Sequence, residues 1–223
     1  MTPTEAARLI DISAVRTQHT RSDIEEVVAY AKKYRFINVH TLPNWTKELA
    51  EMLADTPDVY VGAPVGFPSG GQKSALKVAE ARALVADGVQ EMDIVMNVGR
   101  FRSGEYDYVL NELIEIIEGT PSHIQTKVII ELNTLNDKEM KKACEIAIAA
   151  QADYVKTGTG WVPGDANIER IRSMKEICGS KTKIKAAGGI RTPQEFLTLC
   201  EIGVERFGIN TKSAIEIVEF FKG

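Results

Sequence analysis

The sequence predicts a (β/α)8 TIM barrel, and three observations support this prediction. Strand-like and helix-like segments alternate from end to end of the 223 residues, a pattern typical of parallel βαβ units. Eight such units can be counted, and no linker or second compositional block separates them, so we expect one domain over residues 1–223. An open doubly wound sheet is the alternative; it is disfavoured because no G-x-G-x-x-G segment follows the first expected strand.

The expected strands are short apolar runs bounded by turn residues. They cover residues 9–13, 37–41, 59–65, 90–96, 126–132, 152–157, 183–187 and 205–209. Amphipathic patterns predict helices over 22–34, 44–54, 71–87, 105–118, 137–150, 167–178, 193–201 and 211–221, with Ser22 capping the first. Because barrel enzymes carry their sites at the carboxyl ends of the strands, polar residues at those ends are the functional candidates.

Composition narrows the function classes. The net charge of -4 gives no basic footprint for nucleic acid or membrane surfaces, so we expect neither partner. No apolar run approaches the ~18 residues of a membrane span, and the N-terminal residues do not resemble a signal peptide. The cysteines, Cys144, Cys178 and Cys200, are few, odd in number and without C-x-x-C spacing, which predicts a reducing, cytoplasmic location.

Two lysines at strand ends are the most informative feature of the chain. Lys156 lies in ADYVKTGTGW and Lys185 in KIKAAGGIRT, each after apolar residues and before small ones. Two neighbouring amines in a partly desolvated site repel each other's charge, so each holds its proton less tightly. The neutral amine that results can attack a carbonyl and form a Schiff base.

Carboxylates on neighbouring strands are the candidate partners of these lysines. Asp93 lies inside the apolar run EMDIVM and shares parity with Glu91, so it is either an ion-paired core residue or a proton-relay group facing the lysines. Glu131 and Asn133 share parity near the end of the fifth strand. Either could line the site, and Glu131 could equally pair with a lysine.

Glycines and polar residues at the last three strand ends predict an anion site. Backbone N–H groups can approach an anion at such turns, and barrels often bind phosphate after strands seven and eight. The candidates are Thr157, Gly188, Gly189, Gly208, Asn210 and Thr211. The segment GFPSGGQKS fails the spacing of a phosphate loop because of Gln72, so it is interpreted as a substrate-side loop.

The histidines are not spaced as metal ligands, so no metal site is predicted. His40 follows the second strand and either points into the site or packs in the core.

At these residues the chain resembles the deoxyribose-phosphate aldolase family of class I aldolases. The motifs that carry the resemblance are EMDIVMNVG, KVIIEL, ADYVKTGTGW, KIKAAGGIRT and RFGIN, in the family's order over nearly the whole chain. The resemblance implies a (β/α)8 barrel that cleaves 2-deoxyribose 5-phosphate reversibly to acetaldehyde and glyceraldehyde 3-phosphate, without metal or other cofactor. It also implies a small sugar phosphate as the partner and a possible homodimer or larger homo-oligomer.

The resemblance also implies roles for individual residues. Lys156 resembles the Schiff-base lysine, Lys185 the second lysine that lowers its pKa, and Asp93 the carboxylate that relays protons through water. Asp11 matches the family's strand-one aspartate. Gly188, Gly189 and Gly208 lie where the family holds phosphate.

Several positions around this catalytic set depart from the family pattern. His40 stands where cysteine is usual, Asn133 and Gly158 replace a cysteine and a serine, Ala187 replaces a serine, and Asn210 replaces a small hydroxyl residue. These departures predict a modified acceptor pocket, which could take a different sugar phosphate or a more polar sugar derivative. Two alternatives stay open: a sugar-phosphate isomerase or synthase without a covalent lysine, and a non-catalytic sugar-phosphate sensor.

Overall fold

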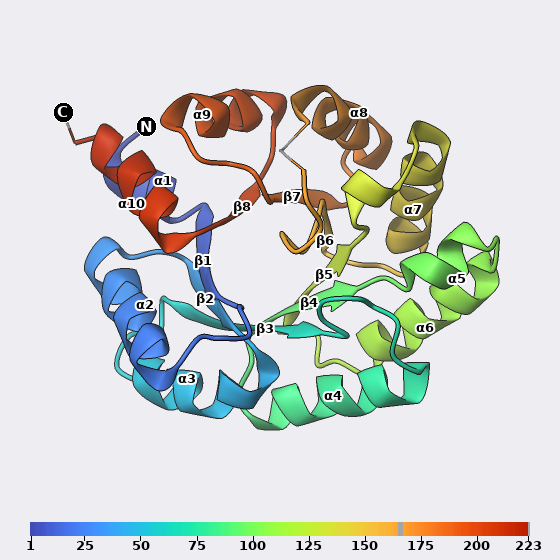
Figure 1. The fold of residues 1–223 in the computed structure, drawn as a ribbon, viewed down its shortest axis with the longest axis horizontal. Coiled ribbons are helices and arrows are strands. Elements are labelled where there is room, and N and C mark those ends of the chain that lie inside the picture. The colour runs from blue at the N-terminus through green and yellow to red at the C-terminus, as the bar shows by residue number, and fades with distance from the viewer. Residues whose placement is uncertain (165–166, 223) are drawn as a thin grey trace.

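Eight parallel strands close into a barrel in the computed structural model, which describes residues 1–164 and 167–222. Each strand pairs with its neighbour in chain order, and β8 pairs with β1 to complete the ring. Figure 1 shows the ring with the helices around its outside. The predicted (β/α)8 fold is confirmed; residue 223 of the predicted domain lies outside the described residues.

The strands lie within a few residues of the predicted ranges. They are β1 Ile10–Ala14, β2 Asn38–Thr41, β3 Tyr60–Val65, β4 Glu91–Val95, β5 Gln125–Ile129, β6 Tyr154–Lys156, β7 Lys183–Ala187 and β8 Arg206–Ile209. The helices that match predicted ones are α2 Arg21–Tyr34, α3 Thr46–Leu53, α4 Ser74–Ala86, α6 Tyr106–Glu118, α7 Asp137–Ala149, α8 Ile168–Cys178, α9 Pro193–Ile202 and α10 Thr211–Phe220.

Local sequence explains where the prediction of strict alternation was wrong. A short helix α1, Pro3–Ala7, precedes β1 because Thr2 and Glu5 form a capping box around its first turn. Another, α5, Val98–Arg102, follows β4, where the Asn97 side chain accepts a hydrogen bond from the backbone of Arg100. The predicted cap of α2 was also wrong, since Thr20 rather than Ser22 caps it.

Side chains alternate along the strands between two different environments. Ile12, Ile94 and Val128 are fully buried among the apolar residues that pack the strands against the surrounding helices. Their strand neighbours Asp93 and Lys127 are equally buried but take part in ion pairs between strands. The barrel interior is therefore a charged layer, and its members must be paired to be stable there.

Two further observations concern the lengths of the helices and the state of the cysteines. None of the helices in the described residues is long and apolar enough to span a membrane. The three cysteines are all free thiols; Cys144 and Cys178 are buried, and Cys200 is half-buried.

Candidate active site

Asp93 lies at the centre of the charged interior. One of its oxygens, Oδ2, accepts hydrogen bonds from Lys156 Nζ at 2.7 Å and from Lys185 Nζ at 2.8 Å. The two lysines are direct partners in the register of β6 and β7, and Lys156 is the last residue of its strand. The structure therefore brings together the three residues that the sequence predicted to converge.

Lys185 has a second carboxylate partner that Lys156 lacks. Its Nζ lies 2.5 Å from Asp11 Oδ2, and the other oxygen of Asp11 is bound by Arg206 at 2.8 Å. Gly208 makes room for this arrangement, because a Cβ there would lie 2.9 Å from the Cβ of Ala187 and 3.5 Å from Cε of Lys185. Lys185 is thus fixed between two carboxylates.

The two amines respond differently to this environment. Burial lowers the pKa of Lys156 to about 8; Asp93 opposes this shift, and the charge of Lys185 adds to it. Burial also acts to lower the pKa of Lys185, but Asp11 and Asp93 outweigh it and the pKa is raised. Desolvation, rather than the mutual repulsion expected from the sequence, is therefore the main cause, and Lys156 is the amine that loses its proton first.

Asp93 remains ionised in this site. Burial acts to raise its pKa, but the charges of His40, Lys156, Lys185 and Lys127 hold it well below its usual range. A carboxylate that stays ionised between two amines can hold a water molecule and stabilise a proton on it, which suits a relay through water.

His40 lies beside the carboxylates of Asp11 and Asp93. Its Nε2 is 3.2 Å from Asp93 Oδ1 and its Nδ1 is 3.9 Å from Asp11 Oδ2, yet neither ring nitrogen makes a hydrogen bond. Gly62 on β3 provides the space, since a Cβ there would lie 2.5 Å from the ring. Burial lowers the pKa of His40, so the ring is neutral at pH 7 and carries its charge only at the acid pH where a carboxyl such as Asp93 titrates.

A second charged layer lies beneath the first and was missed by the sequence analysis. Glu91 accepts hydrogen bonds from Lys127 at 2.7 Å, from Arg206 at 2.9 and 3.0 Å, and from Asn38 at 2.9 Å. A signal existed: a buried Glu91 requires cations at inward-facing positions of other strands, which Lys127 and Arg206 occupy.

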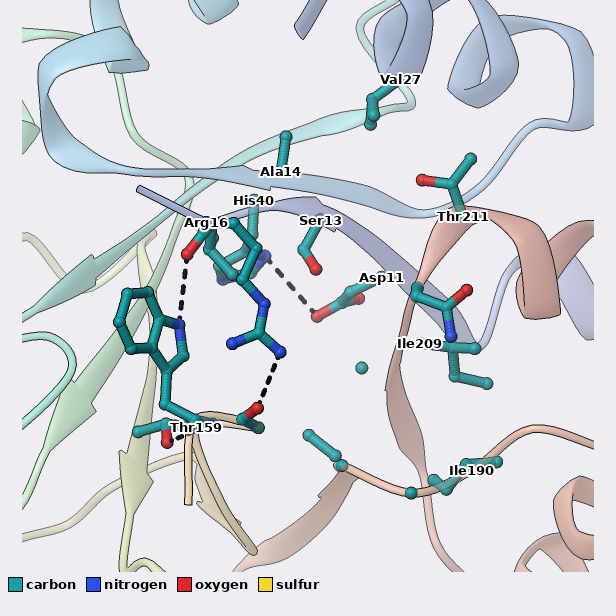
Figure 2. Close-up of a pocket in the computed structure, with 18 of the residues that line it drawn as sticks. Asp11, Ser13, Ala14, Arg16, Val27, His40, Thr159, Ile190, Ile209 and Thr211 are labelled. Atoms are coloured by element: carbon teal, nitrogen blue, oxygen red, sulfur yellow. Dashed lines mark hydrogen bonds and ion pairs between the residues drawn. The ribbon is translucent and has the colours of Figure 1, made fainter. Parts of the chain in front are cut away.

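A cavity of about 1080 Å³ opens above the first layer, at the carboxyl ends of the strands. Figure 2 shows its lining, with Asp11 and His40 near the centre and Ile209 and Thr211 to one side. The predicted site residues that line it are Asp11, His40, Asp93, Lys156, Lys185, Gly188, Gly189, Gly208, Asn210 and Thr211.

Two predicted site residues lie elsewhere. β5 ends at Ile129, and Glu131 adopts a left-handed backbone with φ 53°, so the strand parity does not continue and Asn133 is exposed on a short 3-10 helix. Thr157 is buried, and its hydroxyl donates to the carbonyl of Ala187 and accepts from its N–H. It therefore joins β6 to β7 rather than lining the cavity.

Glu131 and Asn210 each support a segment at the mouth of the cavity. The carboxylate of Glu131 accepts hydrogen bonds from the backbone and hydroxyl of Thr159, rather than pairing with a lysine as one hypothesis held. The side chain of Asn210 caps α10 by accepting from Ser213 N at 3.0 Å. Both side chains fix loops that surround the lysines.

A barrel that presents a buried amine of lowered pKa at its strand ends is of the kind that performs amine-based carbonyl chemistry. No family model matches the chain. It is 41% identical over 218 residues to the deoxyribose-phosphate aldolase of Rhizobium meliloti, covering 98% of this chain and 88% of that protein. It is 39% identical over 214 residues to that of Klebsiella pneumoniae, covering 95% and 86%. The solved structure of "QR15, an Aldolase" superposes with a TM-score of 0.90 at 37% identity, covering 97% of this chain and 96% of that one. The chain belongs to the deoxyribose-phosphate aldolase family.

Proposed function

We propose that this protein is a class I aldolase, an aldehyde-lyase that cleaves 2-deoxy-D-ribose 5-phosphate reversibly to acetaldehyde and D-glyceraldehyde 3-phosphate. The observation that carries the proposal is the Lys156 amine, buried beside Asp93 with its pKa lowered to about 8, in a chain of this family. Neutral amine is then present at physiological pH, which an ordinary lysine of pKa ~10.4 does not provide.

The reaction begins at Lys156. Its neutral amine adds to the C1 aldehyde of the open-chain sugar, and loss of water gives an iminium. A water molecule held by Asp93 and Lys185 takes the proton of the C3 hydroxyl, and the C2–C3 bond breaks with its electrons moving into the iminium. The three-carbon aldehyde phosphate leaves, and an enamine remains on Lys156.

The second half of the reaction returns the protons. The enamine carbon is protonated from the same water and the Asp93–Lys185 pair, and hydrolysis of the iminium releases acetaldehyde. Asp93 suits this role because its Oδ2 contacts both amines, so a proton can move between them over hydrogen-bond distances. Lys185, held cationic by two carboxylates, supplies the electrostatic bias that favours a neutral Lys156.

The substrate is held by the other polar groups that line the cavity. We assign substrate binding to Asp11, His40, Gly188, Gly189, Gly208, Asn210 and Thr211. Gly188 and Gly189 have φ of 90° and 78°, a left-handed conformation that turns the chain sharply at the mouth. A cytoplasmic location and a homo-oligomeric state remain predictions, which cell fractionation and light scattering would check.

Borohydride trapping tests the proposal. The protein is incubated with acetaldehyde or 2-deoxyribose 5-phosphate, reduced, and analysed by intact mass and peptide mapping. We expect an adduct on Lys156 that is absent from Lys156→Met and retained by Lys183→Met, which removes an exposed lysine of β7. No adduct with either compound would instead favour an isomerase or synthase without a covalent lysine, or a binding protein.

A further inference from the structure

The imidazole of His40 is a buried polar group in the wall of the cavity. The residue is 5% exposed, and neither ring nitrogen has a hydrogen-bond partner among the described residues. Gly62 on β3 leaves room for the ring, because a Cβ there would lie 2.5 Å from its Cε1 and Nδ1 atoms. A buried donor and a buried acceptor without partners cost free energy, and a ligand that supplies a partner recovers it.

The charges around the ring indicate which nitrogen carries its hydrogen. The ionisable groups that act on His40 are Asp11, Asp93 and Lys185, and the ring is neutral at pH 7, so it has one N–H donor and one acceptor. Nε2 lies 3.2 Å from Asp93 Oδ1, whereas Nδ1 lies 3.9 Å from Asp11 Oδ2. The closer carboxylate favours the hydrogen on Nε2. At 3.2 Å the direction of the N–H, rather than the distance, prevents a hydrogen bond to Asp93, so the donor remains available.

The carboxylate of Asp93 lies between His40 and the amine that forms the Schiff base. Its Oδ2 accepts from Lys156 Nζ at 2.7 Å, and its Oδ1 faces His40. The strands that carry the two residues, β2 and β6, lie on opposite sides of the ring. In the bound sugar, C1 is bonded to Nζ and the oxygen on C3 is four bonds away from it. His40 is therefore placed to contact the C3 oxygen rather than C1.

An N–H donor at the C3 oxygen suits the bond that the enzyme breaks. In cleavage, the C3 hydroxyl gives its proton to the water held by Asp93 and Lys185, and the electron pair left on oxygen forms the carbonyl of the three-carbon aldehyde. The electrons of the C2–C3 bond move into the iminium. Negative charge develops on the C3 oxygen during this step, and on the same oxygen when the bond forms in reverse. A neutral imidazole can stabilise that charge by donating a hydrogen bond without giving up its hydrogen.

We propose that His40 is a further catalytic residue, whose Nε2–H donates a hydrogen bond to the C3 oxygen while the C2–C3 bond breaks or forms. The inference rests on the proposed aldolase function and deepens it, because it assigns a group to the oxygen of the departing aldehyde. His40 then differs from Asp93 and Lys185, which move protons in both halves of the reaction.

The test compares two reactions of the same Schiff base. One is cleavage of 2-deoxyribose 5-phosphate, measured as kcat. The other is exchange of the methyl hydrogens of acetaldehyde in D2O, followed by NMR without any second aldehyde. Exchange needs Lys156 and the proton relay, but no atom in it corresponds to the C3 oxygen.

Two neutral, polar substitutions differ in how far their N–H groups reach. His40→Asn has a shorter side chain that ends before the position of Nε2, so kcat for cleavage should fall by about 10- to 100-fold, because a hydrogen bond to a charged oxygen is lost. Its exchange rate should stay within about twofold of wild type, because the relay is intact. His40→Gln places an amide N–H near the position of Nε2 and should retain most of the cleavage rate. The matched control is His123→Asn, which removes an exposed histidine before β5 and should change neither rate.

Three outcomes would overturn the inference, with thermal unfolding used to confirm that each variant is folded. Equal losses of cleavage and exchange in His40→Asn would mean that His40 acts through Asp93 or Lys156. Unchanged cleavage in His40→Asn would mean that it contributes nothing to this step. Equal losses of cleavage in His40→Gln and His40→Asn would indicate a base rather than a donor, and the His40→Gln result decides this even if His40→Asn does not fold. Wild type that neither exchanges acetaldehyde nor forms a borohydride adduct would instead reject the aldolase proposal, and the role of His40 with it.

Discussion

Two charged layers lie one above the other inside this barrel, and they differ in how completely their hydrogen bonds are satisfied. In the lower layer, Glu91 is bound by Lys127, Arg206 and Asn38, and none of these four residues lines the cavity. In the upper layer, the amines of Lys156 and Lys185 both donate to one oxygen of Asp93, and the other oxygen of Asp93 makes no hydrogen bond. Both oxygens of the lower carboxylate, Glu91, are hydrogen-bonded, although Asn38 Oδ1 of that layer is not, whereas the central carboxylate of the upper layer has an oxygen left for substrate or water.

The charges of the two layers, counted together, do not balance. The carboxylates of the two layers are Asp11, Glu91 and Asp93, and the cations are Lys127, Lys156, Lys185 and Arg206. Four positive charges against three negative ones leave an excess of one, with His40 neutral. The excess disappears when Lys156 loses its proton, and Lys156 is the amine whose pKa burial lowers to about 8. Loss of the proton from Lys156, the proposed nucleophile, therefore leaves the charges of the two layers balanced.

Removal of the nucleophile is the largest effect we predict. Lys156→Met should reduce aldol cleavage by roughly 10⁴-fold or more, as expected when the group that forms the covalent intermediate is lost. The fold should survive, because Asp93 keeps Lys185 as a partner. Coupled assay of aldehyde release and thermal unfolding would measure the two quantities. Lys183→Met is the control, and substantial turnover by Lys156→Met would exclude the Schiff-base mechanism.

Asp93→Asn should reduce kcat by about 10³-fold while leaving Lys156 in place, because the relay of protons between the amines is lost. Removing this negative charge also takes away the attraction that opposes deprotonation, so the pKa of Lys156 should fall further. The pH dependence of borohydride trapping measures that change in pKa independently of turnover. An unchanged kcat would show that Asp93 is only an ion-pair partner.

A substitution in the lower layer should instead lower the stability of the folded protein. Glu91→Gln leaves the buried cations Lys127 and Arg206 with one fewer negative charge, and breaking such a pair costs about 3 kcal/mol or more in the free energy of unfolding. At a temperature where the variant remains folded, the pH dependence of its activity should match that of wild type. Urea unfolding and a pH–rate profile test this; a loss of activity with no loss of stability would contradict the division into two layers.

The comparison also shows what one sequence can and cannot reveal. The upper layer was predictable because Lys156, Lys185 and Asp93 are each unusual within an apolar strand and lie where a barrel places its site. Lys127 and Arg206 were missed because a lysine or arginine near the start of a strand also suits an exposed position. Their burial follows from pairing between strands, which strand parity alone does not give.

The wrong predictions for residues near the mouth of the cavity have a different cause. The expected fifth strand ran to residue 132, whereas the chain leaves the sheet after Ile129 and turns at Glu131. Asn133 therefore faces solvent instead of the cavity. The contact between Arg16 and Trp161 joins residues that are 145 positions apart in the sequence, and the register of a closed barrel, rather than any local pattern, brings them together.

The smallest predicted effect is a shift in the pH dependence of activity, and it tests the influence of Lys185 on the pKa of Lys156. In wild type, kcat/KM should rise as pH increases through about 8, because the neutral form of Lys156 accumulates above its pKa. Lys185→Met removes a neighbouring positive charge that lowers this pKa, so the midpoint should move to higher pH. Activity at pH 7 should then fall by about tenfold for each pH unit that the midpoint rises. Lys212→Met is a matched control, since it removes a lysine of the mouth that is not among the groups lowering the pKa of Lys156. A midpoint that stays near that of wild type would mean that burial alone sets the pKa of Lys156, and that Lys185 acts only by anchoring Asp93 and Asp11.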